Sequence, residues 1–400
     1  MGALDGFVVL DLTQGLCGPS CTMQMGDAGA KIIKVEPLSG DCARGYGPPF
    51  VNGESPAFLS LNRNKESIAL DTAAAQGRRV LQALARKADV VVVEDIGAGS
   101  AKDLGVSYRS LRRKKPGVIY CELTAFGDEG PLAGLAGAEL PVQAMSDYWG
   151  SLGVIGQPPI RVGADIASVN AGAFAFEAIL AALYHREMTG EGQRVSVSML
   201  GALLHMRGII WAAISDPDEW IGFHCDTYIK PPEQGYKTKD GRIYFMLRRG
   251  SQEDFDKLAL DLGVEEAFTD PRFQQAGRNA TGTGKWAYLV KHIWERGFKD
   301  KTNEELIALI RGHNGEAVPV NTYESLMRHP HIQALDPFVE VQHPKAGAVK
   351  MPKIPWHMDA TPGSIRLPPP LLGQHTDSIL EWAGLSPAQV TRLRKANVIK

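Results

Sequence analysis

One segment of this chain reads Pro158-Pro-Ile-Arg-Val-Gly-Ala-Asp165, continues as Ala171-Gly-Ala-Phe-Ala-Phe-Glu-Ala-Ile-Leu-Ala-Ala-Leu183 and closes with Arg186-Glu-Met-Thr-Gly190-Glu-Gly-Gln193. The apolar run is rich in small residues and predicts a long helix that ends at the glycine-rich turn. The next residues, Arg194-Val-Ser-Val-Ser198, alternate as a strand does. Asp165 therefore lies where a loop enters a helix. Its carboxylate could be a helix N-cap, a salt-bridge partner or a covalent nucleophile.

Short apolar runs alternate with helical patterns on the N-terminal side of this segment. The runs at 7–12, 31–36, 67–71, 89–94 and 118–123 predict strands, and residues 73–87 predict a helix. The run at 89–94 is almost wholly apolar, which is typical of a strand covered on both faces. This alternation predicts an α/β fold with a Rossmann-like parallel sheet.

The pattern changes beyond Gln193, which indicates a second domain. An apolar helix is expected over 200–214, a hairpin over 236–247, and helices over 252–262, 286–295 and 303–311. Because 400 residues exceed the usual size of one hydrophobic core, we expect two domains. The large domain is expected to hold residues 1–200 and, after a return of the chain, 330–400. A smaller α+β domain is expected to be inserted between them, over 225–325.

Composition argues against several classes of protein. The apolar content of 44% and charged content of 22% are those of ordinary globular proteins, and a net charge of −2 gives no general attraction for nucleic acid or anionic membranes. The sequence shows no run of eighteen uninterrupted apolar residues and no signal-peptide pattern, so we expect no membrane span. The five cysteines lack pairing or metal-ligand spacing. We therefore expect reduced thiols and a cytoplasmic location.

Phosphate-binding and metal-binding patterns can be set aside. Thr281-Gly-Thr-Gly-Lys285 resembles a Walker loop, but Asn279 stands where its first glycine belongs and Trp286 replaces the Ser or Thr. The first strand leads into Gln14-Gly-Leu-Cys-Gly-Pro19, which has no dinucleotide signature. The ten histidines lack the spacing of metal ligands, so no metal is expected. Without an ATP loop, any acyl activation must use energy that a substrate already stores.

Asp165 remains the candidate for chemistry. Composition alone favours a helix N-cap. However, Gly163 permits the close approach of a ligand. Small residues beyond Asp165 could leave room beside the helix; they are Ser168, Ala171, Gly172 and Ala173. An exposed carboxylate beside accessible backbone is what covalent carboxyl catalysis requires.

Several separate blocks of the sequence resemble the class III CoA-transferases, a family that includes formyl-CoA transferase and carnitine CoA-transferase. The blocks include Val9-Leu-Asp-Leu-Thr13 with Gly18-Pro19, Gly29-Ala-Lys-Ile-Ile-Lys-Val-Glu-Pro37 with Gly40-Asp41, Asn62-Arg-Asn-Lys-Glu-Ser67, the segment from Asp165 to Gln193, and Leu372-Gly-Gln-His-Thr-Asp377. Each block is weak alone. Their order and spacing over nearly the whole chain are specific.

The resemblance implies a fold and a mechanism. The fold is a large CoA-binding domain with an inserted smaller domain, and two chains form an interlocked homodimer. Asp165 falls on the family's nucleophilic aspartate, which attacks an acyl-CoA thioester and forms an aspartyl-acyl anhydride and then an aspartyl-CoA thioester. A small carboxylic acid then accepts CoA. Coenzyme A is thus expected as the acyl-CoA co-substrate, with no metal and no nucleic-acid partner.

The resemblance also implies site residues. CoA contacts are expected from Leu16, Cys17, Leu70, Asp95, Ile96, Gly97, Lys102 and Leu104, with Ala138 beside them. Glu139 aligns with an acidic residue near the nucleophile in the formyl-CoA branch and is a second candidate catalytic residue. The alternative for Glu139 is that it caps a helix starting near Pro141. Tyr148, Trp149, Trp211 and His224 could be substrate-side residues or core residues.

Departures from the family pattern shape the alternatives. Ala138 stands where racemases of the superfamily carry a histidine, so half of the acid/base pair for α-proton transfer is missing. An acyl-CoA racemase or isomerase is one alternative, and a catalytically silent acyl-CoA-binding relative is another. The glycine run of the formyl-CoA branch is absent from Pro231–Tyr236, which argues against oxalate or formate. Pro37 replaces a basic residue of that branch's CoA site.

Overall fold

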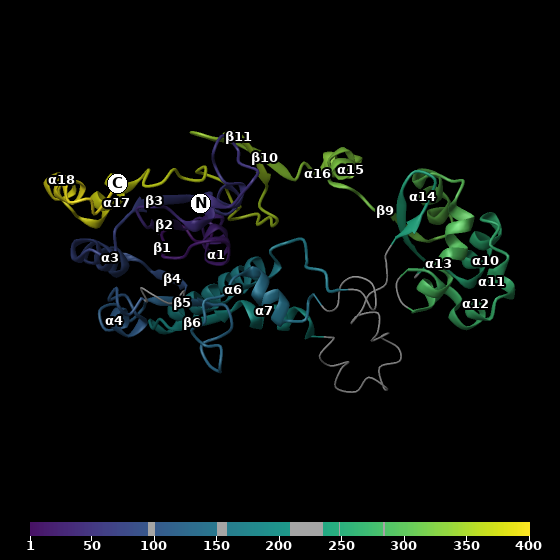
Figure 1. Ribbon diagram of the computed structural model, residues 1–400, viewed down its shortest axis with the longest axis horizontal. Coiled ribbons are helices and arrows are strands. Elements are labelled where there is room, and N and C mark those ends of the chain that lie inside the picture. Colours follow the sequence, from purple (N-terminus) through teal and green to yellow (C-terminus); the bar gives the residue numbers. More distant parts are fainter. Residues whose placement is uncertain (95–100, 150–157, 209–234, 248, 283–284) are drawn as a thin grey trace. The chain divides into compact units, whose positions relative to one another are not determined.

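The computed structural model describes residues 1–94, 101–149, 158–208, 235–247, 249–282 and 285–400. The chain divides into two compact units. Unit 1 comprises residues 1–146, 162–206 and 337–400, and unit 2 comprises residues 147–161 and 207–336. Each unit has its own sheet (Figure 1). Each also has its own cluster of buried apolar side chains.

Unit 1 is built on a six-stranded sheet in which every neighbouring pair is parallel. Its strands, in spatial order, are β3 (Lys65–Ala69), β2 (Lys31–Glu36), β1 (Val8–Asp11), β4 (Val90–Glu94), β5 (Ile119–Thr124) and β6 (Arg194–Ser198). The prediction of a Rossmann-like parallel sheet is confirmed. The third strand begins two residues earlier than predicted and ends before Leu70.

The strand order reverses between β1 and β4. From β1 the chain runs outward to β2 and β3, and from β4 it runs the other way to β5 and β6. In open α/β sheets, ligands bind beyond the carboxyl ends of the strands at such a reversal. This edge of the sheet is therefore where a site is expected.

Helices cover both faces of this sheet (Figure 1). One face packs against α3 (Ala75–Lys87), α4 (Tyr108–Arg112), α17 (Thr376–Ala383) and α18 (Pro387–Lys395). The other packs against α1 (Cys17–Asp27) and α6 (Ile166–Thr189). Shorter elements of unit 1 are α2 (Pro56–Leu61), α5 (Glu139–Met145), α7 (Met199–Met206) and the hairpin of β10 (Phe338–His343) and β11 (Gly347–Pro352).

Helix α6 is long and apolar enough to cross a membrane by length and composition alone, with a mean hydropathy of 1.7. This differs from the expectation that no segment would qualify, because scattered polar residues interrupt the apolar run without lowering its mean much. In the structure α6 packs against α1, α5, α7, β5 and β6. These contacts are those of a core helix in a layered fold.

Unit 2 combines a small antiparallel sheet with helices. The sheet holds β7 (Tyr236–Lys237), β8 (Arg242–Met246) and β9 (Glu316–Pro319), and the predicted hairpin is confirmed by the β7–β8 pair. Among its described residues the helices are α10 (Gln252–Asp261), α11 (Glu266–Thr269), α12 (Pro271–Ala276), α13 (Lys285–Phe298), α14 (Asn303–Gly312), α15 (Tyr323–Arg328) and α16 (Pro330–Leu335). Buried aromatic rings around Trp294 pack edge to face in its core.

Candidate active site

A cluster of buried charges lies under the carboxyl end of β1. Lys34 and Lys65 are fully buried, and Lys65 Nζ lies 3.1 Å from Asp11 Oδ2. Lys34 Nζ lies 2.7 Å from Asp41 Oδ2. Because a buried charge is costly without an opposite partner, these groups must be held together for the fold to be stable.

The charged groups in this cluster shift one another's pKa values. Burial acts to raise the pKa of Asp11, but Lys34 and Lys65 outweigh it and hold that pKa well below its usual range. Burial likewise acts to lower the pKa of Lys34, and the neighbouring carboxylates Asp11 and Asp41 outweigh it and raise that pKa. For Lys65 burial dominates and lowers the pKa to about 8. Asp11 is therefore ionised at neutral pH, with Lys34 as its permanently charged neighbour.

This cluster anchors the loop that follows β1. Lys34 Nζ donates to the carbonyl oxygen of Thr13 at 3.0 Å, and Asp41 Oδ1 accepts from the Gly15 amide at 2.8 Å. The loop leads directly to Leu16, which is half-buried, and to Cys17, which is buried at the first turn of α1. The cluster thus fixes the position of two residues that the sequence predicted as CoA contacts.

Glu94, at the end of β4, binds the loop between β1 and α1. Its carboxylate accepts from the Gln14 amide at 3.0 Å and from the Gly18 amide in the first turn of α1 at 3.4 Å. Burial raises the pKa of Glu94 to about 7, and the hydrogen bonds from the two amides only partly offset this. In dinucleotide-binding Rossmann folds the first helix N-terminus holds a pyrophosphate. Here the protein's own carboxyl group occupies that position, in accord with the missing dinucleotide signature.

Asp165 is the N-cap residue of α6, and it is exposed. Its backbone dihedral angles are φ −83° and ψ 59°, and its side chain accepts no capping hydrogen bond from α6. Apart from its two chain neighbours, none of the residues that the structure describes comes within 4 Å of the point where a Cβ on Gly163 would be, so there is open space beside Gly163. A sealed carboxylate would have excluded the nucleophile hypothesis. Because Asp165 is exposed, the hypothesis that it is a nucleophile is not excluded.

Glu139 lies in α5 and contacts the start of α6. Its Oε1 accepts from the Ala167 amide and its Oε2 accepts from the Ser168 amide, both at 2.8 Å. One alternative was that Glu139 caps a helix starting near Pro141. Glu139 does cap a helix, but that helix is α6. Glu139 begins α5 itself, and it caps α6.

The sequence suggested that four small residues after Asp165 leave room for a ligand, but three of them are packed against protein. Ser168, Ala171 and Gly172 are buried. A Cβ on Gly172 would lie 2.7 Å from the Cys17 carbonyl oxygen and 2.9 Å from Ser20 Cβ, so α1 fills this space. The close packing brings the start of α6 to the start of α1. Accordingly, burial raises the pKa of the Cys17 thiol, and the charges of Glu94 and Glu139 raise it further.

The other predicted CoA contacts have varied surroundings. Leu70 is buried, and Leu104 packs against the core formed with α3 and α4. Lys102 is exposed, as is Ala138, the N-cap residue of α5. Asp95, Ile96 and Gly97 lie outside the described residues, as do Trp211 and His224. Tyr148 and Trp149 are half-buried in unit 2, where the Arg207 guanidinium lies over the Tyr148 ring.

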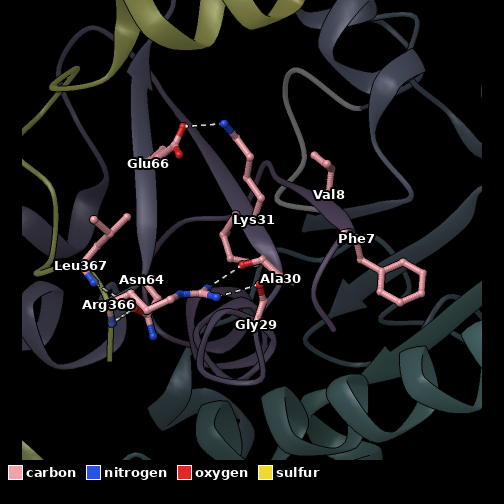
Figure 2. Close-up of a pocket in the computed structure, with 11 residues that line it drawn as sticks. Phe7, Val8, Gly29, Ala30, Lys31, Asn64, Glu66, Arg366 and Leu367 are labelled. Carbon is pink, nitrogen blue, oxygen red and sulfur yellow. Dashed lines mark hydrogen bonds and ion pairs between the residues drawn. The ribbon is translucent and has the colours of Figure 1, made fainter. Parts of the chain in front are cut away.

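A cavity of about 460 Å³ opens at the other edge of the sheet (Figure 2). It lies by the amino ends of β1 and β2, where Arg366 donates to the carbonyl oxygens of Gly29 and Ala30. Neither Asp165 nor Glu139 lines it. Its place in the topology is opposite to that of ligand sites in this class of sheet. In the part of the chain that the structure describes, no three His, Cys, Asp or Glu residues are grouped to hold a metal ion.

The fold and the site together define a doubly wound α/β protein with an exposed carboxylate at the carboxyl edge of its parallel sheet. The chain belongs to CoA-transferase family III, whose family model matches residues 4–376. It is a CoA-transferase.

Relatives of known name and structure agree with this assignment. The chain is 32% identical to a succinyl-CoA:glutarate CoA-transferase of Mus musculus, covering 95% of this chain and 86% of that protein. It is 27% identical to a formyl-CoA:oxalate CoA-transferase of Streptomyces coelicolor, covering 99% of each. A CaiB/BaiF family protein from Brucella suis has a similar crystal structure, with a TM-score of 0.80, 26% identity and coverage of 96% of this chain and 99% of that one.

Proposed function

We propose that this enzyme transfers CoA from an acyl-CoA donor to a carboxylic acid through covalent intermediates on Asp165. The Asp165 carboxylate attacks the thioester carbonyl carbon, the carbon–sulfur bond breaks, and CoA leaves as a thiolate. The thiolate then attacks the aspartyl carbonyl of the mixed anhydride, which releases the donor acid as a carboxylate and leaves an aspartyl-CoA thioester. The acceptor carboxylate repeats these two steps in reverse and leaves as the new acyl-CoA.

The observation that carries this proposal is the exposure of Asp165 at the start of α6 in a family III chain. One thioester is exchanged for another, so no external energy source is required. The buried cluster around Asp11 and the Glu94 carboxyl group hold the loop at Leu16 and Cys17 beside the site. We assign the nucleotide part of CoA to Lys102 and to the residues after β4.

The first substrates to assay are succinyl-CoA as donor and glutarate as acceptor. Relatives from Mus musculus, Homo sapiens and Agrobacterium fabrum carry names that specify this pair of acids. Oxalate and citramalate form the second part of the panel, since other relatives are named for them. Formation of the new acyl-CoA is followed by chromatography. A silent acyl-CoA-binding relative would give no exchange with any pair.

Trapping tests the covalent step directly. Hydroxylamine added during turnover should convert the Asp165 intermediate into a hydroxamate, and peptide mass spectrometry should find that change on the peptide containing Asp165. An unmodified peptide under turnover conditions would contradict the anhydride route. Turnover in heavy water separates transfer from racemisation, because only α-proton exchange would introduce deuterium into the acyl product.

The working form is proposed to be an interlocked homodimer. Helix α6 is apolar, yet Val169 is 44% exposed and Tyr184 and Met188 are each 70% exposed. Exposed apolar area of this kind on a core helix is typical of an interface. Light scattering should give the mass of a dimer for the native chain. Tyr184→Glu should disrupt it, whereas Tyr323→Glu, which changes a residue 91% exposed, should not. A monomeric native chain would contradict the proposal.

A further inference from the structure

The amides that begin α6 are bonded by a residue from another helix. In an ordinary helix the N-cap side chain accepts from the second or third amide. In α6 these amides belong to Ala167 and Ser168, and the N-cap residue is Asp165. Both amides instead donate to the Glu139 carboxylate at 2.8 Å. Asp165 is in the N-cap position of α6, but Glu139 accepts the capping hydrogen bonds.

The backbone of Asp165 also differs from that of self-capping residues in this chain. Ser251, Asp270, Thr302 and Thr322 each accept a hydrogen bond from their own helix. Their ψ angles are 174°, 125°, 163° and 168°, in the extended region that N-cap residues favour. At Asp165 ψ is 59°. The chain thus enters α6 in a geometry unlike that of an N-cap whose side chain reaches back to its helix.

Gln143 holds Glu139 in place. It lies one turn further along α5 and is buried. Its Nε2 donates to Glu139 Oε1 at 2.6 Å and to the carbonyl oxygen of Ala164 at 3.0 Å. The same amide group therefore connects the substitute cap to the residue that precedes Asp165.

We propose that Glu139 is a positioning residue that takes the capping amides of α6 so that the Asp165 carboxylate is kept from binding them. The inference rests on the proposed nucleophilic function of Asp165. A carboxylate that accepts amide hydrogen bonds is stabilised as an anion, so it is a weaker nucleophile. Both oxygens of Glu139 accept backbone hydrogen bonds, so we assign it a structural role at the start of α6 and no part in proton transfer.

A double-mutant cycle on stability tests the exchange of caps. In the native background Asp165→Ala removes no capping hydrogen bond, because Asp165 does not cap α6. In the Glu139→Ala background Asp165 becomes the cap, and its removal should raise the unfolding equilibrium constant about fivefold. Urea midpoints measure both. Equal effects of Asp165→Ala in the two backgrounds would overturn the proposal.

Kinetics separate positioning from proton transfer. Glu139→Ala should lower kcat about 10- to 100-fold with little change in the KM for acyl-CoA, because the nucleophile is misplaced while the CoA contacts remain. Glu139→Gln keeps one acceptor oxygen and should recover part of that loss. Equal activity of the Gln and Ala variants would indicate an acid/base role instead. Glu187→Ala, in the last turn of α6, is the matched control and should leave both constants unchanged.

The two proposals fail in different ways. If Asp165→Asn keeps full turnover, the nucleophile assignment is wrong, although the stability cycle can still show coupling between positions 139 and 165. If the cycle shows no coupling, the cap exchange is wrong even when Asp165 is essential. Should Glu139→Ala fail to fold, the cycle is measured with Glu139→Gln.

Discussion

Four helices of unit 2 begin in a different way from two helices of unit 1. In unit 2, α10, α12, α14 and α15 are each capped by the residue directly before them. In unit 1, α1 and α6 receive carboxylates from elsewhere: Glu94 at the end of β4 bonds the first turn of α1, and Glu139 in α5 bonds the first turn of α6. In α6 the distant carboxylate binds the amides that the N-cap residue, Asp165, does not cap. Both such helices start at the carboxyl edge of the sheet.

Two aspartates make the contrast concrete. Asp270 and Asp165 are each the N-cap residue of a helix. Asp270 accepts from the Arg272 amide at 2.9 Å and from the Arg272 guanidinium, and these hydrogen bonds lower its pKa to about 2. A carboxylate held in that way is a structural anion. Asp165 makes no capping bond, and its helix is served by Glu139. The same residue type in the same position therefore caps one helix and does not cap the other.

The largest expected effect comes from exchanging these two aspartates for asparagine. Asp165→Asn should lower kcat at least about 1,000-fold, because an amide cannot form the anhydride, while the urea midpoint stays nearly unchanged. Asp270→Asn should leave kcat unchanged and lower the urea midpoint, because the charge paired with Arg272 is lost. Steady-state kinetics and urea unfolding of both variants provide the check. Equal loss of activity in the two would remove the contrast.

The sequence was sufficient for the sheet and for the identity of the exposed carboxylate. The strands could be predicted because runs such as Val90–Val93 are apolar throughout, which requires cover on both faces. The choice between N-cap and nucleophile for Asp165 stayed open, because it depends on Glu139 reaching Ala167 and Ser168 across a contact between two helices. No local pattern encodes such a contact.

The same limit explains the error over small residues. Gly172 suggested space for a ligand, but a glycine permits close approach by any partner, and here that partner is Cys17 and Ser20 of α1. The pattern shows that something approaches closely and does not show what. Likewise, Glu94 was visible as the end of a valine-rich strand. Its bond to the Gly18 amide required the β1–β4 pairing that only the fold supplies.

A smaller loss of activity is expected when Glu139 is kept but the side chain that holds it in place is removed. Gln143→Leu deletes the donor to Glu139 Oε1 and to the Ala164 carbonyl oxygen. Loss of two partly buried hydrogen bonds should cost about 2 kcal/mol of stability. The kcat should fall by less than in Glu139→Ala, because the two bonds from Glu139 to α6 remain. Urea unfolding and kcat are measured together. If kcat falls further than in Glu139→Ala, Gln143 acts on the reaction by another route.

Glu94, the carboxyl group that binds the first turn of α1 from the end of β4, should give the protein a pH-dependent stability. Its pKa in the folded protein is about 7, above the ordinary 4.5, because of burial. The folded state therefore binds more protons than the unfolded state between these values, and this contribution to stability is lost as pH rises through the window. Glu94→Gln cannot ionise. The stability of the variant relative to the native chain should therefore improve from pH 5 to pH 8, as measured by urea midpoints. A constant difference across this range would show that Glu94 is ionised throughout.

The smallest effect is expected where a helix of unit 2 loses its own cap. Thr302 accepts from the Glu305 amide, and the Glu305 side chain accepts in return from the Thr302 amide. Thr302→Ala removes the first bond and should cost about 1 kcal/mol of stability. Its kcat and KM should equal those of the native enzyme, because α14 begins at an ordinary cap with no chemistry at its N-cap position. A change in kcat on Thr302→Ala would show that helix N-termini in unit 2 also influence catalysis. Whether a helix is capped by its own N-cap residue or by a residue from another element would then say nothing about catalysis.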